Sequence, residues 1–308
     1  GITNSGSVAP ATETWLFQGS TSNSLNGTAI TLLGHLKINN SGGITQYIGE
    51  LHSQSLTVES GSVYQIEPGK NLTTTGSTSL SSGQCLVLKS DASGTASFID
   101  NGEITGSGTA RIERYLTKYN VVSDLKFHFI ASPVADGQSI ENEFINLSSA
   151  DITDFYKWDE PSNLWINYRG STYNSRNEAF GDNFKFVAGK GYMVAYPGNT
   201  TKSFSGGPYT NSLGLTINCT NTDNRGWNLV GNPFPSALDW EAVLRGNGID
   251  RALYYYDNET PGYKYYISYS GGLGSASQYI APMQGFMVHA NSSGGDKTIT
   301  INNADRTH

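Results

Sequence analysis

The chain has 308 residues, of which 36 are glycine and only 15% are charged, and its formal net charge at pH 7 is −7. Its 19 lysines and arginines form no long run, so it lacks the basic footprint that binds phosphate backbones, and no nucleic acid is expected as a partner. No segment approaches the roughly 18 consecutive apolar residues that a spanning helix needs, so no membrane span is expected in this chain.

The first third of the chain consists of short β-segments separated by glycine and serine. The expected strands cover residues 29–33, 35–38, 55–58, 63–66, 85–88, 96–99 and 110–112. Short strands that turn at Gly or Asn are typical of the stacked rungs of a parallel β-helix or β-roll. Because the segments have no strict period, an irregular sheet packed against the next domain is the competing interpretation. We therefore predict a β-helix-like, β-roll or irregular β domain over residues 1–112.

Residues 113–308 contain one pattern of strands and turns twice. Residues 126–134 return as 226–234, residues 155–159 as 253–257, and residues 189–194 as 283–288. The recurring positions are aromatic, aliphatic, Gly and Pro, which are residues that pack and form turns. The repeat therefore indicates a shared architecture rather than a duplicated catalytic site. Two such units can bury each other's apolar faces, which predicts a pseudo-symmetric β-sandwich module with repeats 113–217 and 218–308. The expected fold class is all-β.

Each repeat is also expected to contain a short helix followed by a β-hairpin. In the second repeat a cap, a first-turn acid and an apolar face come from Ser236, Asp239, Trp240, Val243 and Leu244. Ile140 and Phe144 keep the same face in the first repeat. The hairpin strands cover residues 155–158 and 164–168 in the first repeat, and residues 253–256 and 263–266 in the second.

The second hairpin is rich in tyrosine. Tyr254, Tyr255 and Tyr256 are consecutive, and side chains alternate along a strand, so some of these rings are expected to reach solvent unless another layer covers them. Exposed Tyr and Trp rings suit stacking on sugar rings or gripping a protein partner. The candidate ligand-binding residues are Tyr255, Tyr263, Tyr266, Trp165 and Tyr168.

A second interpretation of the aromatic residues leaves no binding surface. In that case Tyr254, Tyr256, Trp158 and Tyr156 fill the sandwich core. The rings of Tyr255, Tyr263 and Tyr266 then form ordinary cross-strand pairs. The two interpretations differ in geometry, because a binding platform requires rings that lie coplanar and exposed.

The chain lacks the familiar catalytic and metal-binding motifs. It contains no Gly-x-Ser-x-Gly, His-Glu-x-x-His, Walker or Cys-x-x-Cys motif, and its five histidines have no metal-ligand spacing. Neighbouring acids occur as Glu141 with Glu143, Asp239 with Glu241, and Asp257 with Glu259. A glycosidase needs two carboxylates about 5 to 10 Å apart across a cleft, whereas helix starts and turns explain these acids better. We expect no catalytic residue and no enzyme activity.

No cofactor is expected, and structural calcium is the one alternative that the turns leave open. Candidate oxygen ligands lie at residues 182–183, 223–224 and 257–259, although turn chemistry also explains each of these segments.

Two features bear on the compartment in which the protein works. Cys85 and Cys219 lie in different parts of the repeat pattern, so the sequence establishes no disulfide, and each is expected to be a buried small hydrophobe. The chain starts at Gly1 without a methionine or an apolar signal segment, which is typical of a mature or trimmed chain.

The segment Gly-Trp-Asn-Leu-Val-Gly-Asn-Pro-Phe-Pro-Ser-Ala-Leu-Asp-Trp, residues 226–240, resembles a phrase found in large secreted and surface proteins of Bacteroidetes-type bacteria. In those proteins the phrase typically stands close upstream of the C-terminal sorting domain of the type nine secretion system, behind β-helix-like segments. The resemblance covers roughly residues 85–308 and implies export to the cell surface or the medium. It implies no particular activity.

These observations favour a non-catalytic, exported surface-protein segment that acts in adhesion or recognition, with a glycan or a surface protein as partner. The alternatives are an accessory or spacer module of a polysaccharide-degrading enzyme, and a hydrolase that uses carboxylates of the β-helix-like region. Two facing acids in an open groove would support the last of these.

Overall fold

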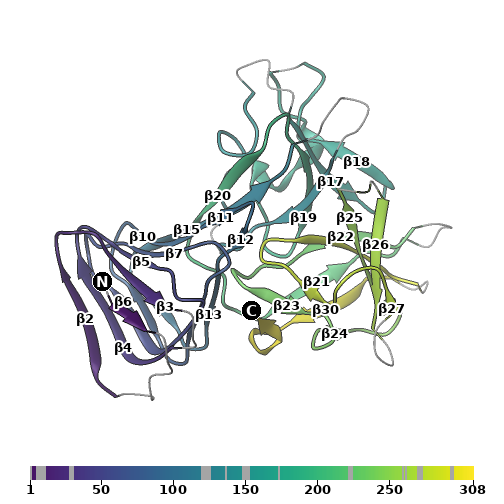
Figure 1. Ribbon diagram of the computed structural model, residues 1–308. Coiled ribbons are helices and arrows are strands. Elements are labelled where there is room, and N and C mark those ends of the chain that lie inside the picture. The colour runs from purple at the N-terminus through teal and green to yellow at the C-terminus, as the bar shows by residue number, and fades with distance from the viewer. Residues whose placement is uncertain are drawn as a thin grey trace.

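The computed structural model describes residues 2–4, 12–27, 31–118, 126–135, 137–147, 153–172, 174–220, 225–258, 260, 262–268, 273–291 and 295–308. The fold is all-β, as predicted, and no α-helix occurs among these residues. Single 3-10 turns are present at Glu178–Phe180, Asp182–Phe184 and Asn303–Asp305. Figure 1 shows a solenoid-like region in purple to blue, followed by the first repeat in teal and the second in green to yellow.

The N-terminal region is built from two sheets of parallel strands, which confirms the β-helix-like interpretation. One sheet contains β1 (Ile2–Asn4), β3 (Asn23–Gly27), β5 (Ile44–Gln46), β7 (Tyr64–Ile66), β10 (Gln84–Leu88) and β15 (Thr109–Leu116). The other contains β2 (Thr14–Gly19), β4 (Thr31–Asn40), β6 (Glu50–Val58), β8 (Asn71–Thr74), β13 (Ser97–Asp100), β9 (Thr78–Leu80) and β14 (Ile104–Thr105). A small hairpin joins β11 (Ser90–Asp91) to β12 (Gly94–Thr95). Inward-facing aliphatic side chains such as Leu36, Leu56 and Leu86 are fully buried and form the core of this region.

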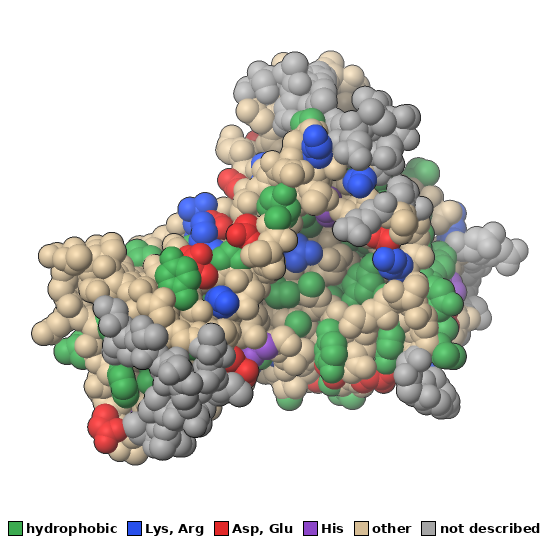
Figure 2. Space-filling view, viewed as in Figure 1, with side chains coloured by type: hydrophobic (Ala, Val, Ile, Leu, Met, Phe, Trp, Pro, Cys, Tyr) green, Lys and Arg blue, Asp and Glu red, His purple; other side chains and the backbone are tan. Residues whose placement is uncertain are grey.

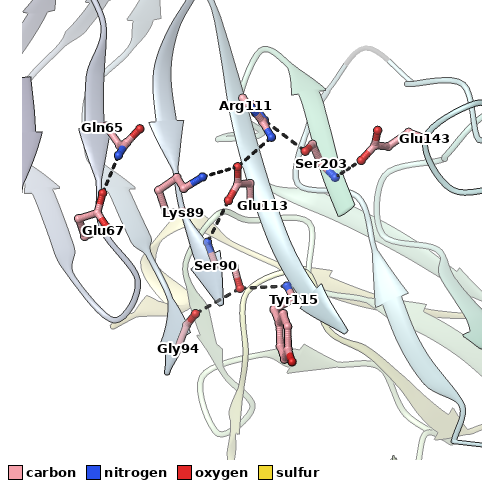
Figure 3. Close-up of polar contacts among 10 residues, drawn as sticks. All are labelled: Gln65, Glu67, Lys89, Ser90, Gly94, Arg111, Glu113, Tyr115, Glu143 and Ser203. Atoms are coloured by element: carbon pink, nitrogen blue, oxygen red, sulfur yellow. Dashed lines mark hydrogen bonds and ion pairs between the residues drawn. The ribbon is translucent and has the colours of Figure 1, made fainter. Parts of the chain in front are cut away.

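The solenoid passes directly into the first repeat through a shared sheet. β15 pairs in parallel with β10 and antiparallel with β20 (Thr200–Gly206), over seven residue pairs from Ala110 to Leu116. The boundary predicted between residues 112 and 113 therefore lies inside β15. At this junction the buried Glu113 carboxylate pairs with Lys89 (2.9 Å) and Arg111 (3.0 Å), as Figure 3 shows.

The two repeats have the same strand order. The sheet of the first repeat runs β16 (His128–Ala131), β19 (Gly191–Ala195), β17 (Asp154–Asp159) and β18 (Leu164–Asn167). The sheet of the second runs β22 (Trp227–Gly231), β29 (Gly285–His289), β25 (Ala252–Asp257), β26 (Gly262–Ile267) and β27 (Leu273–Gly274). The remaining strands form two small sheets, with β21 (Leu213–Ile217), β30 (Lys297–Ile301) and β24 (Leu244–Arg245) in one, and β28 (Tyr279–Ile280), β23 (Ala237–Asp239) and β31 (Arg306–Thr307) in the other.

The prediction of a short helix in each repeat is wrong. In the second repeat, Leu238 pairs with Ile280 and Arg306, so strands on both sides hold the backbone where a helix was expected to start. The Asp239 carboxylate accepts a hydrogen bond from the Glu241 amide (3.0 Å), as a helix cap would, but the turn does not continue. Trp240 remains fully buried, so the apolar spacing predicted burial but not the type of element.

The second repeat also docks on the solenoid. The amide of Phe98 in β13 donates to the carbonyl of Pro235 (2.9 Å). The His308 ring is within 2.7 Å of the hydroxyls of both Thr73 and Ser97. In Figure 1 the C-terminus accordingly lies between the solenoid and the second repeat.

Cys85 and Cys219 are both free, and only Cys85 is fully buried. Acidic and basic side chains are dispersed on the face seen in Figure 2, with no extended basic patch among the residues coloured there. None of the described helices is long and apolar enough to cross a membrane.

Candidate binding site

Each repeat sheet has one face toward its own core and one face toward the other repeat. Side chains of β17 illustrate this, because Phe155 is buried in the core of the first repeat whereas Tyr156 and Trp158 face the second. In β25, Leu253 and Tyr255 face the core of the second repeat, and Tyr254 and Tyr256 face the first. The cluster between the repeats is centred on Phe129, Met193, Leu229 and Met287.

Glycines at equivalent positions of the two repeats bring the sheets close together. A Cβ atom on Gly191 would lie 2.6 Å from Leu229 Cγ and 2.6 Å from the Val230 carbonyl oxygen. A Cβ atom on Gly285 would lie 3.0 Å from the Cβ of Phe129. The recurrence of glycine in the sequence pattern therefore has a packing reason, since a Cβ would overlap its neighbours at Gly191 and would be tight against Phe129 at Gly285.

An open pocket of about 380 Å³ lies among the aromatic rings between the repeats. Its described lining is Trp158, Asn163, Trp165, Trp227, Tyr254, Tyr263 and Met287. Five of these seven residues are aromatic and none carries a charge. Since β17 and β18 contribute from the first repeat and β22, β25, β26 and β29 from the second, the pocket exists only where the two copies meet.

Hydrogen bonds and ring contacts across the repeats hold the walls of the pocket. Trp158 Nε1 donates to the backbone carbonyl of Trp227 (2.7 Å), so a ring of the first repeat is fastened to a strand of the second. The Trp227 ring packs against His289 at a centroid distance of 4.7 Å. His289 is itself held by the Asp250 carboxylate (2.7 Å) and the Arg225 carbonyl (3.0 Å).

Glu160 fastens the β17–β18 hairpin of the first repeat to the segment that leads into β22. Its side chain is only 2% exposed, and it accepts hydrogen bonds from the amide and hydroxyl of Thr220 (3.0 and 2.8 Å) and from the Gly226 amide (2.8 Å). Burial raises the pKa of this carboxyl, but the hydrogen bonds from Thr220 and Gly226 outweigh that effect and lower the pKa overall. An ionised Glu160 thus positions Trp227 through the preceding residue.

Several polar groups around the pocket have no hydrogen-bond partner among the described residues. They are the side-chain amide of Asn163, the indole N–H groups of Trp165 and Trp227, and the hydroxyls of Tyr254 and Tyr263. Asn163 has a positive φ of 57° at the tip of the hairpin, and its backbone amide donates to the Glu160 carbonyl (3.0 Å). The lining therefore combines apolar ring faces with a few groups that can bind a polar ligand.

The structure brings together two of the five residues that the sequence singled out. Trp165 and Tyr263 both line the pocket. Tyr168 is fully buried in the core of the first repeat, where its hydroxyl donates to Glu141 (3.0 Å) and burial raises its pKa. It is therefore not available as part of a binding surface.

Tyr255 and Tyr266 also lie away from the pocket, because their side chains are on the opposite face of the sheet from Tyr263. Burial raises the pKa of Tyr255, whose ring packs against the core of the second repeat. Tyr266 is 7% exposed, and its hydrogen bond to Glu241 (2.6 Å) raises its pKa to about 12. The expected platform of Tyr255, Tyr263 and Tyr266 does not form, since only Tyr263 faces the other repeat.

The remaining pocket residues were missed from the sequence as ligand-binding candidates. From the sequence, Tyr254 and Trp158 are expected only as packing residues, and Trp227 only as part of the segment at residues 226–240. The available signal is strand phase, because Trp158 lies directly opposite Trp165 and shares its face.

The acidic residues that are close together in the sequence bind nearby backbone amides and basic side chains. Glu141 accepts from Arg176 Nη2 (2.7 Å), Glu143 accepts from the Ser203 amide (2.7 Å, Figure 3), and Asp257 pairs with Lys264 (2.8 Å). Each of these carboxylates is thus already engaged by a donor. In the solenoid, the buried Asp100 accepts from Thr74 (2.8 Å) and joins two rungs.

The calcium candidates show the same pattern where the structure describes them. Asp182 binds Lys190 through both carboxylate oxygens at 3.0 Å. Asp223, Asn224 and Glu259 lie outside the described residues. Within the described ranges, no three His, Cys, Asp or Glu side chains gather as a metal-binding group would require.

Comparison of the chain with curated proteins and with solved structures gave no match. Comparison with protein families gave one match, which covers residues 33–308 and so includes most of the solenoid and both repeats. That range joins the three parts that the shared β15 and the inter-repeat pocket connect in space. The chain therefore belongs to the family described as "Domain of unknown function (DUF8693)".

Proposed function

We propose that this chain is a non-catalytic recognition segment of an exported surface protein, and that it binds a neutral carbohydrate in the pocket between its repeats. The observation that carries the proposal is the lining of five aromatic rings without any charged side chain. An anionic ligand would leave its charge against the apolar ring faces, at a desolvation cost that no described lining residue offsets by ion pairing.

A sugar has the chemistry that this lining complements. Its C–H faces are apolar and pack on aromatic rings, while its hydroxyls need donors and acceptors at the ring edges. The pocket supplies both kinds of group, because the Trp and Tyr faces adjoin the indole N–H of Trp227, the hydroxyl of Tyr254 and the amide of Asn163. Binding pockets for small ligands commonly have this composition of many apolar groups and a few polar ones.

The recurring phrase at residues 226–240 supports the export part of the proposal through its resemblance, and its structural role is mainly architectural. The Asn232 amide donates to the carbonyls of Ser236 (2.8 Å) and Ala281 (3.0 Å), and Trp240 Nε1 donates to the Arg251 carbonyl (3.1 Å). Only Trp227 of this phrase lines the pocket. A scaffold that recurs in many exported proteins could thus carry pockets of different specificity.

The test compares two exposed tyrosines. Tyr263 is 55% exposed and lines the pocket, whereas Tyr279 is 53% exposed and lies outside it. On an array of neutral oligosaccharides, the wild-type protein should bind at least one sugar series, measured further by titration calorimetry. Tyr263→Ala should weaken that binding about tenfold by removing one ring, and Tyr279→Ala should leave it unchanged.

Two results would oppose the proposal. Equal binding by the Tyr263→Ala and Tyr279→Ala variants would place the ligand elsewhere on the protein. Because aromatic rings also attract quaternary ammonium ions, choline chloride is titrated in parallel, and binding of choline without any sugar would replace carbohydrate by a cationic ligand.

A further inference from the structure

The rings that line the pocket stand at steep angles to one another. The planes of Trp158 and Trp165 meet at 65°, with centroids 5.1 Å apart, and those of Trp227 and Tyr254 meet at 74°, also 5.1 Å apart. A polysaccharide chain that lies along a surface needs successive rings that face the same way. In these two pairs neighbouring rings meet edge to face, so the lining offers no row of coplanar rings along which a longer sugar chain could continue beyond the pocket.

The residues that line the pocket range from buried to exposed. Met287 is only 6% exposed, whereas Tyr263 and Asn163 are exposed, so we place the entrance at Tyr263 and Asn163. Its volume of about 380 Å³ is near the lower end of the roughly 300–1,000 Å³ typical of small-ligand pockets. This space suits one or two sugar rings that enter end first.

The turn that carries the polar group at the entrance has a defined backbone conformation. Asn163 has a left-handed backbone conformation, and its turn is fixed by the Glu160 carbonyl and by the Asp159 carboxylate, which accepts a hydrogen bond from the Ser162 amide (3.1 Å). The Asn163 side-chain amide has no hydrogen-bond partner among the described residues. An amide carries both donors and an acceptor, so it can bind the adjacent hydroxyls of one sugar.

From these three observations we infer that the pocket recognises the terminal sugar of a glycan, with Asn163 as a specificity-determining residue at the entrance. The inference rests on the proposed function and adds the form of the ligand. The end of a neutral chain is inserted between the repeats, and the rest of the glycan extends into solvent past Tyr263.

The experiment measures how affinity depends on glycan length. Neutral hexose and N-acetylhexosamine oligomers of one to six units are attached through their reducing ends, and the best series is repeated in solution by calorimetry. Affinity should stop rising at two units, and the six-unit oligomer should bind within about twofold of the two-unit one, because further units make no contacts. Methylating the hydroxyls of the terminal sugar should abolish binding.

Asn163→Gly tests the entrance residue without straining the turn, since glycine readily adopts a positive φ. Loss of its hydrogen bond should weaken binding about fivefold. Asn142→Gly is the matched control, because Asn142 also has a positive φ, of 71°, and is exposed away from the pocket. Equal affinities of these two variants would remove Asn163 from the inference.

The remaining outcomes distinguish a failure of terminal recognition from a failure of carbohydrate binding as a whole. Affinity that rises with every added unit, or undiminished binding of oligomers with a blocked end, would overturn terminal recognition and leave carbohydrate binding in place. Failure to bind any oligomer of any length would overturn the proposed function itself, and this inference with it.

Discussion

At the scale of single residues, the two repeats have different polar side chains at one equivalent strand position. His128 and Asn228 occupy equivalent positions in β16 and β22. Asn228 accepts from the Asn218 amide and donates to the Asn218 carbonyl, both at 2.9 Å, whereas His128 Nε2 lies 3.0 Å from the Thr117 carbonyl. Burial lowers the pKa of His128 to about 4, and the positive charges of Arg114 and Lys126 add to the effect.

The neutral form of His128 makes stability depend on pH. Between its ordinary pKa of 6.5 and about 4, the unfolded chain binds a proton at this residue that the folded chain does not, so lowering the pH through this window favours unfolding. His128→Asn, which copies the second repeat, should flatten this part of the profile. Urea denaturation of both proteins between pH 7 and pH 4 measures the difference, and parallel profiles would contradict the expectation.

The alternation of side chains along a strand explains why the positions of the aromatic rings could be predicted only in part. The sequence shows that Tyr254, Tyr255 and Tyr256 must divide between two faces of a strand, and this division is observed. It does not show which face meets the other repeat, because that depends on packing between segments far apart in the chain. Of the predicted candidates, Trp165 and Tyr263 therefore line the pocket, whereas Tyr255 and Tyr266 face the core of the second repeat.

At the scale of elements, the closeness of the two repeat sheets depends on glycine. Gly191 begins β19 and Gly285 begins β29, and both face residues of the other copy. The parallel strands of the solenoid and the repeated sheets could be predicted from short apolar segments and turn residues. The helix could not be excluded, because the strands that displace it, β28 and β31, come later in the sequence.

Gly191→Ala should destabilise the protein, because its methyl group would overlap Leu229 and the Val230 carbonyl. We expect a loss of about 1–3 kcal/mol in the free energy of unfolding, as for other overpacked sites. Gly198→Ala is the matched control, since a Cβ there meets nothing within 4 Å. Urea denaturation measures both, and equal stabilities would show that the sheets can separate without cost.

At the scale of the whole molecule, the solenoid and the first repeat share one continuous apolar core. Buried residues from Leu25 in the solenoid to Phe204 in β20 belong to the same cluster. Phe204 packs against Phe144 (4.8 Å) and Phe186 (5.1 Å) of the first repeat while its backbone pairs with the solenoid strand β15. The predicted domains are therefore joined by packing as well as by chain connectivity.

Unfolding should accordingly be one cooperative event. We expect a single calorimetric transition for the full chain, and Phe204→Ala should lower the stability of the whole transition by about 3–5 kcal/mol. Two resolved transitions, or a variant that destabilises only one part, would show instead that the solenoid and the repeats fold separately.

The junction between solenoid and repeats has a mechanical consequence. A glycan held in the pocket and a solenoid pulled from its far end would load the seven residue pairs of β15 and β20, the Phe98–Pro235 hydrogen bond and the His308 contacts at the same time. Tension shared among bonds in parallel is smaller on each one. The junction would thus withstand a pulling force that would break these contacts if they were loaded one after another.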